Sequence, residues 1–146
     1  MVTGASQGIG AGVVQAFLAR GYNVVGTSRS ATKSKELSAS DHLALIDGDI
    51  GQFETAQKVA ELAIKTFCSI DAVVANAGIY TVKSFIDYTA EDFRALVSTN
   101  LEGFIYITQL AVKQMLAQKS GGSIVSITSS MVENPIAGVP IPSYDY

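Results

Sequence analysis

The sequence predicts an α/β protein built on a doubly wound parallel sheet. Short apolar runs rich in β-branched residues alternate along the chain with longer segments of helical periodicity. The short runs are apolar almost throughout, which is typical of parallel strands covered by helices on both faces. A chain of 146 residues can bury one core. We therefore expect one domain over residues 1–146, with strands 1 to 5 of such a sheet.

Five segments are expected to form these strands. Each is bounded by Gly, Asp, Asn or Ser, as a buried strand between turns should be. A short stub at residues 1–3 is followed by runs at 22–28, 42–49, 70–78 and 123–130.

Three segments between the strands are expected to be helices: residues 9–20, 53–67 and a long stretch from Ala90 to Gln118. Thr89 followed by Asp92 forms a candidate capping box at the start of the long helix. Basic and glycine residues in KSGGS, at 119–123, are typical of a helix end. The apolar face of the long helix is expected to consist of Leu96, Leu101, Phe104, Ile105, Leu110 and Leu116.

Composition favours a small-molecule partner. The net charge of -3 is spread without basic or acidic blocks, which argues against a nucleic-acid groove or a basic membrane-facing patch. The sequence shows neither a secretory signal nor an apolar run of roughly 18 residues that would span a membrane. The single cysteine, Cys68, is expected to be a small core residue, and no Cys/His cluster suggests a metal. We expect a cytoplasmic protein.

The stretch TGASQGIG, at residues 3–10, is the strongest local signal of a nucleotide site. Gly4, Gly8 and Gly10 lie between an expected strand and an expected helix, where missing side chains let the backbone approach a pyrophosphate at a helix N-terminus. A glycine triplet alone is weak evidence, since a chance turn can contain one. Its position between strand and helix makes the nucleotide interpretation much stronger.

Together with NAG at residues 76–78, Asn100 in STNLEG and the serine-ending run IVSITSS, this turn resembles the short-chain dehydrogenase/reductase family. The resemblance covers nearly the whole chain, with the landmarks in the family's order. It implies a Rossmann-type, NAD(P)-binding fold with strand order 3-2-1-4-5. It also implies an oxidoreductase that transfers hydride between nicotinamide and a carbonyl or alcohol substrate.

The resemblance further implies which residues line the cofactor. The glycine turn would contact the phosphates, the pair after the third strand the adenine, and NAG the segment after the fourth strand. A solvated turn at Asp49 and a plain turn at NAG remain the alternatives. The implied cofactor residues are Gly4, Ser6, Gln7, Gly8, Ile9, Gly10, Asp49, Ile50, Asn76, Ala77 and Gly78.

The end of the second strand, TSRS, favours NADP(H) over NAD(H). NAD enzymes usually place an acidic residue where Ser28 stands, whereas a 2′-phosphate needs cations and repels carboxylates. Arg29 follows and would bind that phosphate. The alternative is that Arg29 is an ordinary surface arginine.

The resemblance implies catalytic roles for Asn100, Ser129 and Tyr144. In the family a tyrosine is the acid/base, a serine bonds the substrate oxygen, an asparagine supports a proton relay, and a lysine lowers the pKa of the tyrosine. Tyr144 fits the spacing after Ser129 better than Tyr146, and a tail tyrosine without a role is the alternative. The lysine expected four positions after Tyr144 falls beyond the last residue.

We therefore expect an N-terminal portion of such an enzyme, lacking later strands and the substrate loop, with little or no turnover. A catalytically dead nucleotide-binding or dimerisation module and a nonfunctional truncated or frameshifted product are the alternatives. The long helix from Ala90 to Gln118 is the candidate surface for a homo-oligomer. Substrate, reaction direction and oligomeric state stay open.

Overall fold

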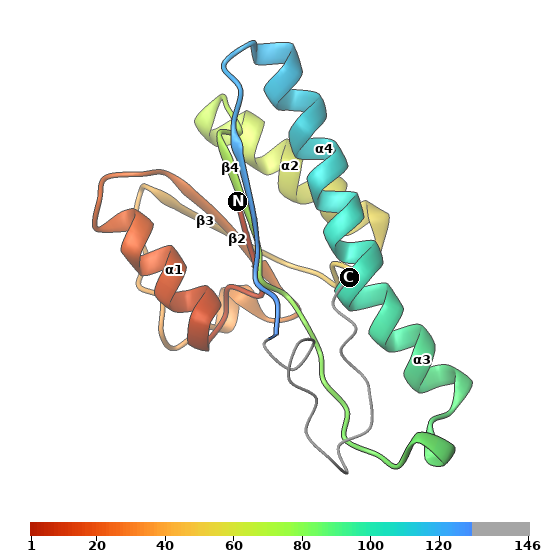
Figure 1. Cartoon of the computed structure of the whole chain (residues 1–146). Coiled ribbons are helices and arrows are strands. Elements are labelled where there is room, and N and C mark those ends of the chain that lie inside the picture. The colour runs from red at the N-terminus through yellow and green to blue at the C-terminus, as the bar shows by residue number, and fades with distance from the viewer. Residues whose placement is uncertain (130–146) are drawn as a thin grey trace.

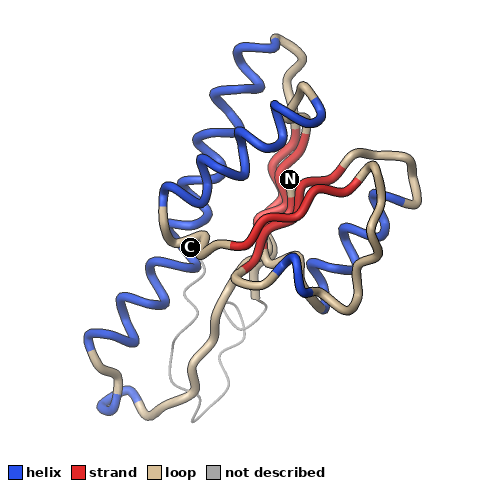
Figure 2. Tube along the Cα trace, turned by 180° about the vertical axis from the view of Figure 1, so that it is seen from behind, coloured by secondary structure: helices blue, strands red, loops and turns tan. Residues whose placement is uncertain are grey.

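A five-stranded parallel sheet lies between helical layers in the computed structural model, which describes residues 1–129 (Figures 1 and 2). The strands follow the order β3-β2-β1-β4-β5, as expected. The chain builds outward from β1 in one direction, then crosses to β4 and builds in the other. The switch point between β1 and β4 is where open α/β sheets bind ligands. The strands are β1 (Val2–Thr3), β2 (Val24–Ser28), β3 (Leu43–Asp47), β4 (Ala72–Ala75) and β5 (Ser123–Ser126).

Helix α1 (Gly8–Leu18) covers one face of the sheet, and α2 (Phe53–Phe67) and α4 (Gly103–Gln118) cover the other (Figure 1). Helix α2 has the expected bounds. Helix α1 ends earlier than expected because the N–H groups of Arg20 and Gly21 turn back to the carbonyls of Phe17 and Leu18. Short 3₁₀ turns, η1 (Ala31–Lys33) and η2 (Phe85–Asp87), lie in the connections.

The expected long helix consists of three consecutive parts: α3 (Ala90–Leu96), the π-helical segment η3 (Val97–Glu102) and α4. The capping box at its start is confirmed. Thr89 Oγ1 accepts a hydrogen bond from Asp92 N at 3.2 Å, and Asp92 Oδ2 accepts one from Thr89 N at 3.0 Å. The π-helical segment was not expected, and such segments are frequently found at functional sites.

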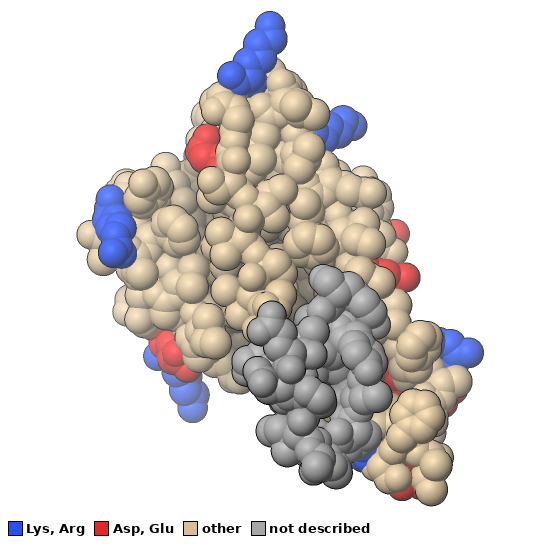
Figure 3. Space-filling view, viewed as in Figure 1, with Lys and Arg blue, Asp and Glu red and all other residues tan. Residues whose placement is uncertain are grey.

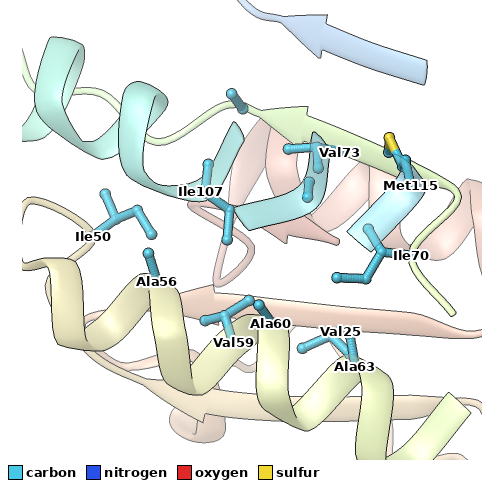
Figure 4. Close-up of a cluster of buried hydrophobic side chains, with 12 residues drawn as sticks. Val25, Ile50, Ala56, Val59, Ala60, Ala63, Ile70, Val73, Ile107 and Met115 are labelled. Carbon is cyan, nitrogen blue, oxygen red and sulfur yellow. The ribbon is translucent and has the colours of Figure 1, made fainter. Parts of the chain in front are cut away.

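The main core lies between the sheet, α2 and α4 (Figure 4). Small side chains on α2, such as Ala56, Ala60 and Ala63, allow the helix to approach Ile107 of α4 closely. Close packing of this kind supplies most of the stability of a helix in a protein. The cluster contains Val25, Ile50, Ala56, Val59, Ala60, Ala63, Ile70, Val73, Ala75, Ile107, Ala111 and Met115.

The expected apolar face of the long helix is confirmed in part. Leu96 is buried, Leu101 is half-buried, and Phe104 and Leu110 pack against the main core, but Leu116 is 73% exposed and Ile105 is 37% exposed. The residues that α4 buries are Gly103, Ile107, Ala111 and Met115. Their spacing of four residues forms one stripe, in which two small residues let the helix approach α2 and the sheet. A prediction that places only the largest apolar residues in the core does not find such a stripe, because two of its four members are small.

Cys68 is also placed differently from the expectation. It follows the last residue of α2 with φ of 65°, in the left-handed conformation, and it is exposed. Its backbone N–H bonds to the carbonyl of Ile64 and ends the helix. Among residues 1–129, no helix is both long and apolar enough to cross a membrane.

Candidate functional site

A cavity of about 460 Å³ lies beyond the carboxyl ends of β1 to β4. It gathers the glycine turn, the end of β2, the turn after β3 and the segment after β4. All of the expected cofactor residues except Gly10 line it. The lining residues are Gly4, Ser6, Gln7, Gly8, Ile9, Thr27, Ser28, Arg29, Ser30, Gly48, Asp49, Ile50, Asn76, Ala77, Gly78, Ile79 and Thr99.

The three glycines of the turn meet different structural demands. A Cβ on Gly10 would lie 2.1 Å from the carbonyl oxygen of Gly4, so helix α1 packs directly on the turn. A Cβ on Gly4 would lie 2.8 Å from Asn76 Nδ2. Gly8 has φ of 56°, and a Cβ there would meet nothing within 4 Å. The space that a side chain of residue 8 would fill is thus empty, which fits close approach of a nucleotide phosphate.

Thr3 and Asn76 tie the ends of β1 and β4 together under this cavity. Thr3 Oγ1 accepts hydrogen bonds from the backbone N–H groups of Asn76 at 3.0 Å and Ala77 at 2.9 Å. In return, Asn76 Nδ2 donates to the carbonyl oxygens of Thr3 at 3.0 Å and Gly4 at 3.3 Å. Asn76 therefore supports the glycine turn. The sequence analysis did not single out Thr3, although the position of Thr3 directly before Gly4 could have indicated its role.

Arg29 lines the cavity at the end of β2 and is exposed. It forms no salt bridge with any residue in the range 1–129. The neighbouring carboxylate of Asp47 at the end of β3 accepts bonds from the N–H of Thr32 at 2.8 Å and its hydroxyl at 2.6 Å. These bonds lower the pKa of Asp47 below its ordinary value. On the face shown in Figure 3, the Lys and Arg side chains stand apart from one another.

Asp49 has a local structural task as well as a place in the cavity wall. Its Oδ1 accepts a hydrogen bond from Gly51 N at 3.0 Å, which closes the turn before α2. Ile50 is buried and belongs to the main core. The turn after β3 thus presents one exposed carboxylate and one anchored apolar residue to the cavity.

An adjoining cavity of about 300 Å³ brings Asn100 and Ser129 together, although they are far apart in the sequence. Asn100 reaches it from η3, and Ser129 follows the end of β5. The two cavities share Ile50, Ala77, Gly78, Ile79 and Thr99 in their linings. Tyr144 and Tyr146 lie outside the described residues.

Comparison with known proteins identifies the family. The sequence model of the short chain dehydrogenases matches residues 1–143. The chain belongs to the short-chain dehydrogenase family. The expected resemblance and the Rossmann-type fold are thereby confirmed, and the curated relatives include dehydrogenases.

The curated relatives of this chain differ in the substrates for which they are named. The chain is 33% identical over 137 residues to the L-rhamnose-1-dehydrogenase of Scheffersomyces stipitis, covering 88% of this chain and 53% of that protein. It is 31% identical over 144 residues to the NADP-dependent (R)-specific alcohol dehydrogenase of Lentilactobacillus kefiri, covering 94% of this chain and 57% of that protein. The chain thus spans about half the length of the curated relatives it matches.

The crystal structure of acetoin dehydrogenase YohF from Salmonella typhimurium superposes with a TM-score of 0.86 at 26% identity. The match covers 99% of this chain and 59% of that of the acetoin dehydrogenase. Among residues 1–129, the structure contains no group of three or more side chains suited to hold a metal ion.

Proposed function

We propose that this short-chain dehydrogenase binds NADP(H) across the two cavities and transfers hydride between the nicotinamide and a carbonyl or alcohol substrate. The observation that carries the proposal is the wall common to both cavities, Ile50, Ala77, Gly78, Ile79 and Thr99. One extended ligand can therefore run from the glycine turn to Asn100 and Ser129. Residues 1–146 would act as the NAD(P)-binding domain.

The preference for NADP(H) over NAD(H) rests on the end of β2. Arg29 lines the larger cavity with no carboxylate paired to it among residues 1–129, and Ser28 stands where an acidic residue would repel a 2′-phosphate. The relative from Lentilactobacillus kefiri is named as NADP-dependent, which agrees with this preference. The relative from Azotobacter vinelandii is named for both cofactors.

For the chemistry, the nicotinamide supplies or accepts the hydride when it is bound. Ser129 would hydrogen-bond the substrate oxygen, and Tyr144 would give or take its proton. A tyrosine with the ordinary pKa of about 10 needs a nearby cation to act at neutral pH. Among the described residues, no lysine lines the cavity around Asn100 and Ser129. The second candidate is a nucleotide-binding module without turnover, since nucleotide binding needs only the glycine turn and the larger cavity around it.

A nucleotide titration tests the proposal. We expect NADPH, followed by its fluorescence, to bind more tightly than NADH. Arg29→Ala should weaken NADPH binding about tenfold and leave NADH nearly unchanged, because a charge-assisted bond to the 2′-phosphate is lost. Arg20→Ala is the matched control, since Arg20 follows the far end of α1 and its side chain, among residues 1–129, bonds only to the carbonyl of Ala16.

Absence of binding by either nucleotide would rule out both candidates for this chain. If Arg29→Ala weakened the binding of NADPH and NADH equally, Arg29 would not be the residue that binds the 2′-phosphate. Turnover with a panel of carbonyl compounds separates the two candidates. Robust turnover that Tyr144→Phe abolishes would decide for the enzyme, and NADPH binding without turnover would decide for the nucleotide-binding module.

The proposal also covers the cellular location and the oligomeric state of the protein. We expect a cytoplasmic protein with a small-molecule substrate. We also expect a homo-oligomer through the long helix, because Ile105, Val112 and Leu116 expose an apolar stripe with helical spacing. Light scattering of the wild type and Leu116→Glu tests this, and a monomeric wild type would contradict it.

A further inference from the structure

A carboxylate of the chain itself lies at the start of α1, beside the cavity proposed to bind the cofactor. Both oxygens of Glu36 accept from the N–H of Gly8, at 3.2 Å and 3.3 Å. Gly8 is the first residue of α1, which has no side-chain cap and no acidic residue in its first turn. The positive end of the helix dipole favours an anion at this position. Here that anion is Glu36.

The backbone of the segment that carries Glu36 is held in place independently of this contact. Ser34 Oγ donates to the carbonyl of Ser6 at 2.6 Å, and the carbonyl of Glu36 accepts from Gln15 Nε2 at 2.6 Å. Ser6 lines the cavity and Gln15 lies within α1. The segment is therefore fastened to both the glycine turn and the helix, while the carboxylate is exposed.

The contact between the carboxylate and Gly8 is one that a ligand can replace. One N–H is shared between two oxygens, and both distances exceed the roughly 2.7–2.9 Å of strong charge-assisted hydrogen bonds. A nucleotide phosphate in the same cavity either competes for this N–H or experiences the negative charge beside it. The repulsion grows with the charge of the nucleotide, so a 2′-phosphate suffers more than a 2′-hydroxyl.

We infer that Glu36 determines the nucleotide specificity of the cofactor cavity. Its carboxylate occupies the position at Gly8 N where an anion would bind. It therefore lowers the affinity for phosphate-rich nucleotides, for NADPH more than for NADH. Arg29 and Glu36 then act in opposite directions on the same 2′-phosphate. The inference rests on the proposed function, because it assumes that the cavity binds these nucleotides.

The variant Glu36→Gln tests the inference while preserving the structure. Glutamine has the same length, and its amide oxygen can still accept from Gly8 N, so only the charge is lost. We expect NADPH to bind about threefold to tenfold more tightly at low salt and NADH at most about twofold more tightly. The gain should shrink at about 0.5 M NaCl, where exposed charges are screened. Glu61→Gln, on the exposed side of α2, is the control with the same change of net charge.

Each outcome separates the inference from the proposed function. Binding of NADPH by the wild type with an unchanged or weakened affinity in Glu36→Gln would overturn the inference and leave the proposed function intact. Failure of both proteins to bind either nucleotide would overturn both. An equal gain in Glu61→Gln would show that only net charge matters and would overturn the inference. The Gly8 amide resonance, recorded without nucleotide, should shift in Glu36→Gln and not in Glu61→Gln.

Discussion

The side-chain amide of Asn100 bonds to both backbone polar groups of Ile79. Asn100 Oδ1 accepts from Ile79 N at 2.9 Å, and Asn100 Nδ2 donates to the carbonyl oxygen of Ile79 at 3.1 Å. This pair joins the π-helical segment η3 to the chain that leaves β4; Ile79 lies in the wall shared by both cavities, and Asn100 lines the smaller one. In this structure Asn100 positions the backbone of Ile79. Its part in a proton relay stays a prediction.

We predict that Asn100→Asp destabilises the protein by about 1–2 kcal/mol, because a carboxylate cannot donate to the carbonyl of Ile79 and faces it with negative charge. Urea unfolding measures the change, and faster amide hydrogen exchange at Ile79 should accompany it. Asn23→Asp is the control, since Asn23 is exposed beside His42 and should change the stability by less than about 0.5 kcal/mol. Equal stability of the two variants would contradict the positioning role.

Two glycines of α1 should respond oppositely to alanine. Gly10→Ala places a Cβ 2.1 Å from the carbonyl oxygen of Gly4, so the turn and α1 must separate. We expect a loss of at least about 2 kcal/mol together with loss of nucleotide binding. Gly12→Ala meets nothing within 4 Å and should stabilise the protein by about 0.5–1 kcal/mol, as alanine does in a helix interior. Thermal unfolding of both variants checks the pair, and a harmless Gly10→Ala would refute the packing argument.

Two buried threonines should respond differently to valine, which has nearly the same shape. Thr3→Val removes the acceptor for the N–H groups of Asn76 and Ala77, and we expect a cost of about 1–3 kcal/mol. Thr27→Val removes a hydroxyl that has no partner among residues 1–129, so stability without ligand should be unchanged or slightly higher. Chemical denaturation of both variants is the measurement. A Thr27→Val variant as unstable as Thr3→Val would show that the Thr27 hydroxyl is bonded.

Asp92 should titrate far below an ordinary carboxyl group. The bond from Lys83, at 2.5 Å, and the bonds from Thr89 lower its pKa from 3.8 to about 2. A carboxyl group whose pKa is lowered by folding stabilises the folded state at pH values above its pKa in the unfolded chain. This contribution is lost as the pH falls from about 4 through 2. We predict that Lys83→Met raises the pKa of Asp92, measured by carboxyl-carbon NMR. Lys113→Met is the control on α4, and an equal effect from it would exclude the Lys83 contact as the cause.

Several features were predictable because they depend on neighbouring residues in the chain. The alternation of apolar strands and helices, the capping box at Thr89 and the glycine turn each occupy a short stretch whose chemistry favours one local conformation. Ile105 and Leu116 of the long helix were misjudged because the exposure of a residue depends on which elements pack beside its helix. Cys68 was misplaced for another reason, because it ends α2 in the left-handed conformation and is exposed there.

The sequence by itself therefore determined the order of the elements, the parallel sheet and the glycine turn, through local conformational preference and apolar pattern. Only the tertiary structure decided that Thr3 meets Asn76, that Asn100 holds Ile79 and that Glu36 lies on Gly8. These contacts join segments between 21 and 73 residues apart. They form because the parallel strand order brings the carboxyl ends of the strands and the connections that follow them to one end of the sheet, and no local pattern encodes which side chains meet there.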